Sequence, residues 1–254
     1  LHNASLIHDD IQDGDTHRRG QTALWTRYGI AQAINAGDFC IALGYASIEA
    51  IAVSPIMNWE LTKILTRASR RIVEGQAAEM CLLTGRIPTF AEYARCVEGK
   101  TSALFSMPIE GAALIAERTN EQATKLVEAC RLLGLLFQIQ DDILDATSRS
   151  SIIGKPVGND LKEKKITLPL IYACEHADKS AGKAIIKAVK SGKLTQKNIE
   201  EIIQFIEDNQ GITRAQAKAQ SIITEAKSKI ASLPESPAKQ SLMNFADYVI
   251  QRSK

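Results

Sequence analysis

Two short acidic motifs are the residues best suited to chemistry in this sequence. Both have the spacing DDxxD, so on a helix the first and last aspartate lie one turn apart and share a face. Two carboxylates on one face repel each other unless a cation lies between them. Magnesium accepts such oxygens and keeps positions open for phosphate and water. The sequence therefore predicts Mg²⁺ as the cofactor. The predicted metal ligands are Asp9, Asp10, Asp13, Asp141, Asp142 and Asp145.

A solvated acidic helix end is the competing interpretation of a single DDxxD motif, because Gly14 stops the first helix directly after Asp13. The second motif argues against it. An apolar run at 132–139 precedes that motif, so its base is expected to be buried. Carboxylates at the edge of an apolar helix are costly without partners. Two such motifs in one helical chain favour a metal site.

Basic and polar residues lie close to both acidic motifs in the sequence. Arginine binds phosphate oxygens bidentately, and lysine adds a point charge. Each basic residue taken alone is commonly a solvated surface group, but together they favour a magnesium–diphosphate complex, which needs charges of both signs. We therefore expect the chain to bind and cleave a diphosphate ester. The residues predicted to bind substrate are Arg18, Arg19, Lys100, Thr101, Gln138, Lys155 and Lys165.

Helices must position these residues, since almost every segment has helical periodicity and no alternating strand-like run stands out. Gly and Pro mark the ends of the helices, and Thr89 with Glu92 predicts a capping box. The simplest fold is a single all-α domain. A first helix is expected to end at Asp13, and Thr119-Asn120 is expected to cap the helix that carries 126–145. The other expected helices are 31–53, 59–84, one after Thr89, 100–118, 167–177, 181–191, 195–208, 211–231 and 236–252, with a loop at 146–160.

Composition excludes several classes of function. The net charge of +2 gives no electrostatic case for nucleic acid. The longest apolar run, 39–48, is too short to span a bilayer. The five cysteines form no CxxC pair and are expected to be small buried residues in a reducing cytosol, which favours a cytoplasmic location. The chain starts with Leu1 and no helix cap, so an N-terminal segment is expected to be missing.

Several stretches, taken together, resemble the trans-isoprenyl diphosphate synthase (polyprenyl synthetase) family. The resemblance covers nearly the whole chain in the family's order. Within the family, the chain resembles the geranylgeranyl and polyprenyl diphosphate synthases. Two DDxxD motifs with this spacing to Arg-Arg and Lys-Thr are highly specific. The matching stretches are 6–13, 18–20, 75–76, 100–101, 137–145, 154–155 and 160–169.

The resemblance implies an all-α isoprenoid synthase bundle around a central cavity, with 1–254 as a polyprenyl synthetase domain that lacks its N-terminal helices. It implies head-to-tail condensation of an allylic diphosphate with isopentenyl diphosphate, and a homodimer. Asp9, Asp13 and Asp141 resemble the main magnesium ligands, and the other motif aspartates resemble supporting ones. Thr101 and Gln138 resemble groups whose oxygens face the allylic cation, which with Lys100 makes them the catalytic residues. The diphosphate ligands by resemblance are Arg18, Lys100, Lys155 and Lys165 for the allylic substrate and Arg19 for isopentenyl diphosphate.

The sequence departs from the family pattern in two places. Lys164 stands where the family has Gly before its Lys-Thr-Leu-Pro, and we expect this to add only surface charge. A Gly-Lys-Arg segment and a histidine that the family carries upstream of the first motif, both for isopentenyl diphosphate, do not occur in this chain. The isopentenyl half of the site is therefore expected to be incomplete in the sequence as given.

Product length is a steric question in this family, because residues one helical turn before the first motif form the floor of the cavity. Here Ser5 and Ala4 stand four and five residues before Asp9, and both are small. A deeper floor argues against a C15 farnesyl product and favours geranylgeranyl diphosphate (C20) or a longer one. Residues of the following helix could also set the stop, and the sequence does not place them.

Two other functions remain open at this point. A terpene cyclase of the same fold would ionise a diphosphate and cyclise it, although cyclases usually replace the second DDxxD with an Asn/Ser/Glu metal motif. A non-catalytic subunit of a heteromeric prenyl synthase should lack acidic motifs, and both are intact here. Omitting isopentenyl diphosphate separates the two enzymes, since a cyclase would still consume the allylic substrate.

Overall fold

The structure is a computed structural model, which describes residues 1–82, 86–118, 121–147 and 158–252. Helices dominate this part of the chain, as the periodicity predicts. They are α1 (His2–Asp13), α2 (Leu24–Tyr28), α3 (Ile30–Glu49), α4 (Pro55–Leu82), α5 (Phe90–Val97), the π-helical turn η1 (Glu98–Ser102), α6 (Ala103–Ile115), α7 (Glu121–Thr147), α9 (Asn159–Lys162), α10 (Leu168–His176), α11 (Lys179–Ser191), α12 (Gln196–Asp208), α13 (Gly211–Ala231) and α14 (Pro237–Gln251).

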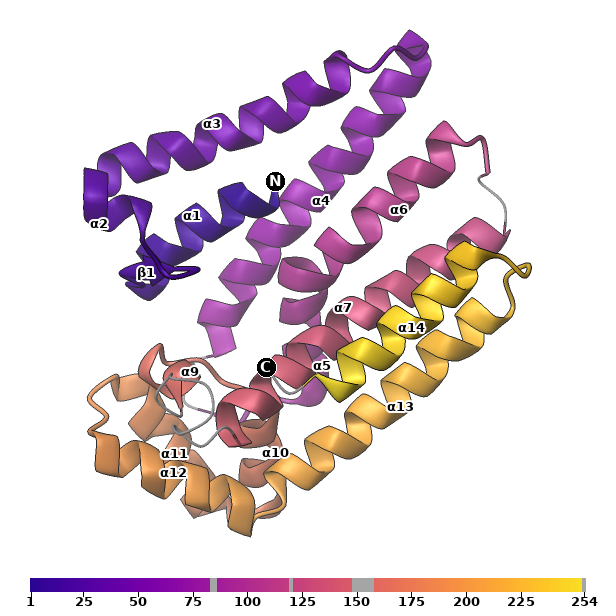
Figure 1. The fold of residues 1–254 in the computed structure, drawn as a ribbon. Helices are drawn as coiled ribbons and strands as arrows, with labels where there is room; N and C mark the ends of the chain where they lie inside the picture. The colour runs from indigo at the N-terminus through magenta and orange to yellow at the C-terminus, as the bar shows by residue number, and fades with distance from the viewer. Residues whose placement is uncertain (83–85, 119–120, 148–157, 253–254) are drawn as a thin grey trace.

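Helix α7 lies at the centre of the bundle (Figure 1). It packs against α6 on one side and against α13 and α14 on the other, while α1 packs against α3 and α4 packs against α6 and η1. The inward face of α7 carries Leu133, Leu136 and Ile139, whose side chains are almost fully buried. Burying large aliphatic side chains in this way is the main favourable term in folding. The second acidic motif lies on this same helix, so the core fixes its position.

Most helix ends agree with the predicted punctuation. Gly14 ends α1 in the left-handed conformation that glycine favours, and the Thr89–Glu92 capping box at α5 is confirmed. The long N-terminal helices differ, because α3 ends at Glu49 rather than 53 and α4 already begins at Pro55. Proline is well tolerated at the first position of a helix, which explains the earlier start. The cap predicted at Thr119-Asn120 lies outside the described residues.

A small hairpin follows α1, although the sequence showed no strand pattern. Strand β1 (His17–Arg18) pairs antiparallel with β2 (Gln21–Thr22). The two turn residues, Arg19 and Gly20, both have positive φ, of 53° and 75°. Two such residues make the tight turn that a two-residue hairpin needs. Strands of two residues are too short to show alternation in the sequence, and the turn places Arg19 at an exposed tip.

The turn η1 carries Lys100 and Thr101, and glycines hold it in place. A Cβ atom on Gly75 of α4 would lie 2.4 Å from the backbone nitrogen of Lys100. A Cβ atom on Gly134 of α7 would lie 2.6 Å from the Cα atom of Ser102. Real Cβ atoms do not approach so closely, so only glycine at these positions allows α4 and α7 to pack against η1 from two sides. This packing fixes the positions of Lys100 and Thr101 relative to both long helices.

Candidate active site

The first acidic motif meets two lysines that come from distant parts of the chain. Lys100 Nζ lies 3.9 Å from Asp9 Oδ2, and Lys165 Nζ lies 3.0 Å from Asp13 Oδ2. Lys100 Nζ also donates to Glu79 Oε2 at 2.9 Å. Burial raises the pKa of Asp9, while Lys100 opposes this and favours the charged form. The turn η1 and the segment after α9 thus both deliver a cation to the Asp9–Asp13 face of α1.

Asp10 lies on another side of α1 and is buried. Its Oδ1 atom accepts from Arg18 Nε at 2.7 Å, and Arg18 Nη2 lies 2.9 Å from Asp15 Oδ2. The helix geometry explains this difference, since a neighbouring residue points about 100° away from Asp9 around the axis. The pair with Asp10 ties the hairpin to α1. Arg18, a predicted substrate ligand, is therefore held by two carboxylates beside the Asp9–Asp13 face.

The second motif also contains a buried aspartate. Asp142 Oδ2 accepts from the Tyr93 hydroxyl at 2.7 Å and from the Leu168 backbone N–H at 2.9 Å. Its Oδ1 accepts from Gln138 Nε2 at 3.1 Å. Burial raises the pKa of Asp142 to about 7, although the three hydrogen bonds favour the ionised form. Protein groups therefore engage both oxygens of Asp142, which was predicted as a supporting metal ligand.

The other two aspartates of the second motif lie at the C-terminal part of α7. Asp145 accepts from the backbone N–H groups of Asn159 and Asp160 at 3.1 and 3.3 Å, at the start of α9. Asp141 forms an ion pair with Arg252, near the C-terminal end of the described chain. These contacts join α7 to two segments that lie far away in the sequence. Arg252 was not predicted, because nothing in its local sequence marks it.

Lys165 joins the first motif to the segment after α9. Its Nζ atom lies 3.0 Å from Asp13 and 2.5 Å from Glu163. Burial raises the pKa of Asp160 well above its ordinary value, Asp145 raises it further, and Lys165 opposes both. Asp160 was missed as a site residue although it lies in a stretch that carries the family resemblance. Its signal was the acid-to-lysine spacing of five residues between Asp160 and Lys165.

The predicted catalytic pair also meets in the structure. The Thr101 hydroxyl donates to Gln138 Oε1 at 3.2 Å, which joins η1 to α7. Nearby, Gln76 of α4 donates to Gln12 of α1 at 2.7 Å. The structure thus brings most predicted residues to one region between α1, α4, η1, α7 and the segment after α9. Lys155 lies outside the described residues, and Arg19 stands at the exposed hairpin tip.

The residues of the first motif fit a magnesium ion by the chemistry of their donors. Asp9 and Asp13 offer hard carboxylate oxygens one turn apart on one face of α1. In the described part of the chain, no three acidic, histidine or cysteine side chains converge closely enough to hold an ion alone. Magnesium is commonly bound by one or two carboxylates together with substrate phosphates and water. Such a site is complete only when a diphosphate is present.

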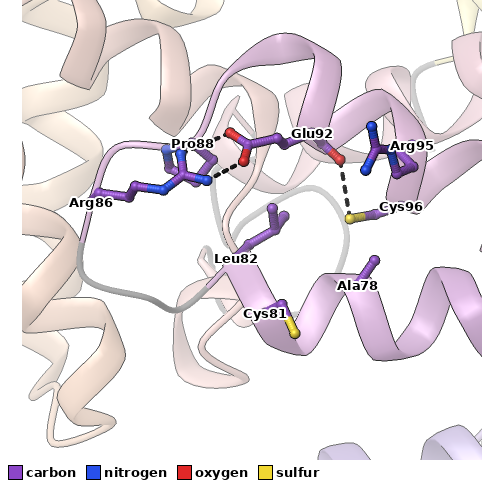
Figure 2. A pocket seen from close by; sticks show the side chains of 8 residues that line it. All are labelled: Ala78, Cys81, Leu82, Arg86, Pro88, Glu92, Arg95 and Cys96. Atoms are coloured by element: carbon purple, nitrogen blue, oxygen red, sulfur yellow. Dashed lines mark hydrogen bonds and ion pairs between the residues drawn. The ribbon is translucent and has the colours of Figure 1, made fainter.

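A cavity of about 220 Å³ lies beside this region, between α4 and α5 (Figure 2). None of the predicted site residues lines it, and an Arg86–Glu92 ion pair crosses one side. Two cysteines line it, and they differ: Cys96 is buried, whereas Cys81 is exposed. The expectation that all five cysteines are buried is therefore wrong for Cys81, and Cys40 is only partly buried. Burial raises the pKa of the Cys96 thiol to about 11, so this thiol stays protonated at neutral pH.

The helical bundle and the two aspartate motifs with their cations define the isoprenoid synthase fold. The polyprenyl synthetase family model matches residues 1–206. The geranylgeranyl diphosphate synthase of Methanosarcina mazei is 34% identical over 99% of this chain and 76% of its own length. The octaprenyl diphosphate synthase of Haemophilus influenzae is 30% identical over 100% of this chain and 75% of its own. Other relatives are named farnesyl diphosphate synthases, so the names span several product lengths.

A solved structure shows the same fold. The geranylgeranyl pyrophosphate synthetase of Pyrococcus horikoshii superposes with a TM-score of 0.87 and 31% identity, covering 99% of this chain and 76% of that one. The chain belongs to the polyprenyl synthetase family of trans-prenyltransferases. Among the described helices, none has both the length and the apolar composition that crossing a membrane requires.

We predict that Lys165→Met destabilises the protein by about 2–3 kcal/mol at pH 8, somewhat less than breaking a fully buried pair costs. Burial raises the pKa of Glu163 and Asp160, and Lys165 opposes this. An acid whose pKa is higher in the folded state destabilises the fold as the pH rises above its unfolded value, about 4. Without Lys165 the pKa values of the two acids rise further, so the variant loses more folding free energy at high pH. The difference in unfolding free energy from wild type should therefore be smaller at pH 5 than at pH 8.

Urea unfolding at pH 8 and pH 5 measures both deficits. Lys197→Met is the matched control, because Lys197 is exposed on α12 and reaches Glu201 only across 3.7 Å of solvated surface. The control should match wild type at both pH values. A Lys165→Met deficit that is equal at the two pH values would contradict the electrostatic role of Lys165.

Proposed function

We propose that the protein catalyses the Mg²⁺-dependent head-to-tail condensation of an allylic diphosphate with isopentenyl diphosphate. The observation that carries the proposal is the pairing of Lys100 with Asp9 and of Lys165 with Asp13. A site for a magnesium–diphosphate complex needs carboxylates for the metal and cations for the phosphate oxygens within a few ångströms of each other. Membership of the polyprenyl synthetase family supports the same reaction.

Ionisation is the first step of the proposed reaction. The C–O bond of the allylic diphosphate breaks, and its electron pair leaves with the diphosphate, so that an allylic cation forms. Bound Mg²⁺ supplies Lewis-acid neutralisation of the leaving diphosphate, with Asp9, Asp13 and Asp141 as its proposed main ligands. Lys100 and Lys165 bind the diphosphate oxygens and stabilise the charge that develops there. The other proposed ligands of the allylic diphosphate are Arg18 and Lys155.

Carbon–carbon bond formation follows. The double bond of isopentenyl diphosphate attacks the allylic cation, and the tertiary cation that results loses a proton to the released diphosphate. Thr101 and Gln138 turn oxygen atoms toward the allylic cation, and Arg19 binds the diphosphate of the second substrate. The site must be dry while the cation exists, because water would capture it.

The residues before the first motif bear on the length of the product. Ser5 lies one turn before Asp9 and is partly exposed, whereas Ala4 is 1% exposed. We propose that the small Ser5 leaves room for a long prenyl chain, so that the product is geranylgeranyl diphosphate or longer. Ala4 lies on the buried side of α1, where a larger residue has no space, so its small size reflects packing and bears less directly on product length.

We also propose that the protein is a homodimer that pairs through α3 and α4. Monomeric proteins rarely expose many large apolar side chains on neighbouring elements. In this chain, α3 and α4 expose Ile34, Phe39, Leu43, Ile56, Trp59 and Val73.

We predict that Asp9→Ala lowers kcat for the condensation by at least about 10²–10³-fold, which is the effect of removing one strong electrostatic stabiliser. The assay follows diphosphate release with geranyl diphosphate, isopentenyl diphosphate and Mg²⁺. Glu200→Ala is the control, since Glu200 lies exposed on α12. Release from wild type should stop when isopentenyl diphosphate is omitted. Allylic substrate consumed without it would indicate a cyclase, and an active Asp9→Ala variant would refute the metal site.

We predict that Ser5→Phe shortens the product by at least one five-carbon unit, because the larger side chain raises the floor beneath Asp9. Mass spectrometry of the product measures the length. Ala4→Phe is the contrasting variant, and because Ala4 is buried it should lower the melting temperature without a defined change in product. A Ser5→Phe enzyme that makes the wild-type product would show that the chain does not pass Ser5.

A further inference from the structure

Gln138 is held at both ends of its side-chain amide. Its Nε2 atom donates to Asp142 Oδ1 at 3.1 Å, and its Oε1 atom accepts from the Thr101 hydroxyl at 3.2 Å. Asp142 is the acceptor in its hydrogen bonds with Tyr93, Leu168 and Gln138, so it takes the NH₂ end of the amide. The carbonyl oxygen of Gln138 must then face Thr101. Asp142 therefore decides which end of the Gln138 dipole lies toward Thr101.

Asp142 is in turn held by hydrogen-bond donors at both of its oxygens. The Tyr93 hydroxyl and the Leu168 N–H donate to Oδ2 at 2.7 and 2.9 Å, and the opposite oxygen faces Gln138. Asp142 and Tyr93 are only 3% and 4% exposed. A carboxylate held this way has little access to a diphosphate or to an ion bound to one. The contacts form a relay from Tyr93 through Asp142 and Gln138 to Thr101.

We propose that Tyr93 and Asp142 are positioning residues, which orient the Gln138 amide so that its oxygen, and not its NH₂ group, faces the developing allylic cation. This inference rests on the proposed function. A preorganised dipole stabilises charge in the transition state without reorganising, whereas a reversed dipole opposes the same charge. The oriented amide stabilises charge that is present only in the transition state. Disrupting the relay should therefore lower kcat and leave substrate binding nearly unchanged.

Asp142→Asn reverses the amide, which makes it the primary test. The Tyr93 hydroxyl and the Leu168 N–H keep the single oxygen of the new residue on their side, so its NH₂ group faces Gln138. Gln138 must then turn its oxygen away from Thr101. We expect kcat to fall on the order of 10²-fold, the effect of losing one directed dipole, with both KM values within about threefold of wild type. The Mg²⁺ concentration for half-maximal rate should not change.

The isosteric swap Asp142→Asn/Gln138→Glu provides the rescue. A carboxylate at position 138 accepts from the new NH₂ group and again presents an oxygen to Thr101. The double variant should recover at least tenfold of the lost kcat. Asp142→Asn/Gln140→Glu is the matched control, because it restores the same net charge on α7 at a residue that instead contacts the Arg252 carbonyl. The control should recover nothing.

Three results would overturn the proposal: a wild-type kcat in Asp142→Asn, a swap that recovers no more than the Gln140→Glu control, or a raised Mg²⁺ requirement that accounts for the loss. If Asp142→Asn does not fold, Tyr93→Phe tests the relay, with an expected fall in kcat of about three- to tenfold at unchanged KM, and an unchanged kcat contradicts it. A wild-type protein that does not condense the two substrates would refute the proposed function itself, whereas an active wild type with unaffected variants would refute only the relay.

Discussion

The balance of charge around the two acidic helix segments governs how the site of this protein is arranged. Asp9 and Asp13 share one face of α1, and Asp145 of α7 lies beside Asp160. Like charges in a partly buried place are costly unless cations lie among them. Lys100 and Lys165 meet this need, and each lies within 4 Å of an aspartate of the first motif. These ion pairs suit the proposed function, because a metal can replace the lysines as partner of the carboxylates while a diphosphate binds the lysines.

The packing of the bundle serves this balance. Lys100 reaches Asp9 only because η1 lies pressed between α4 and α7, at distances that Gly75 and Gly134 permit. Lys165 reaches Asp13 because the segment after α9 is tied to α7 through Asp145. The groups that we propose as ligands of the diphosphate therefore stand on elements that the core already holds, so ordering them adds little to the barrier of the proposed reaction.

Local rules were enough to predict much of the fold and part of the site. The 3.6-residue period, the Thr89 capping box and Gly14 located the helices, and the i, i+4 spacing placed Asp9 and Asp13 on one face. By the same helical geometry, Asp10 points away from the Asp9–Asp13 face and Asp142 points away from Asp141 and Asp145, although the DDxxD pattern groups each of them with those residues. Contacts such as Tyr93 with Asp142 carry no sequence signal, because they join residues 49 positions apart through packing alone. The close approach of η1 to Gly75 and Gly134 on two other helices likewise has no local sequence signal.

Calorimetric titration with inorganic diphosphate, with and without Mg²⁺, measures whether the paired carboxylates and lysines bind a magnesium–diphosphate complex, and it needs neither substrate nor turnover. We expect diphosphate to bind in the presence of Mg²⁺, and we expect removal of the metal with a chelator to weaken binding by at least about 10²-fold. The lysines are then still paired with the aspartates, and the carboxylates repel the added anion. Equal affinity with and without Mg²⁺, or no binding in its presence, would show that these residues do not form a magnesium–diphosphate site.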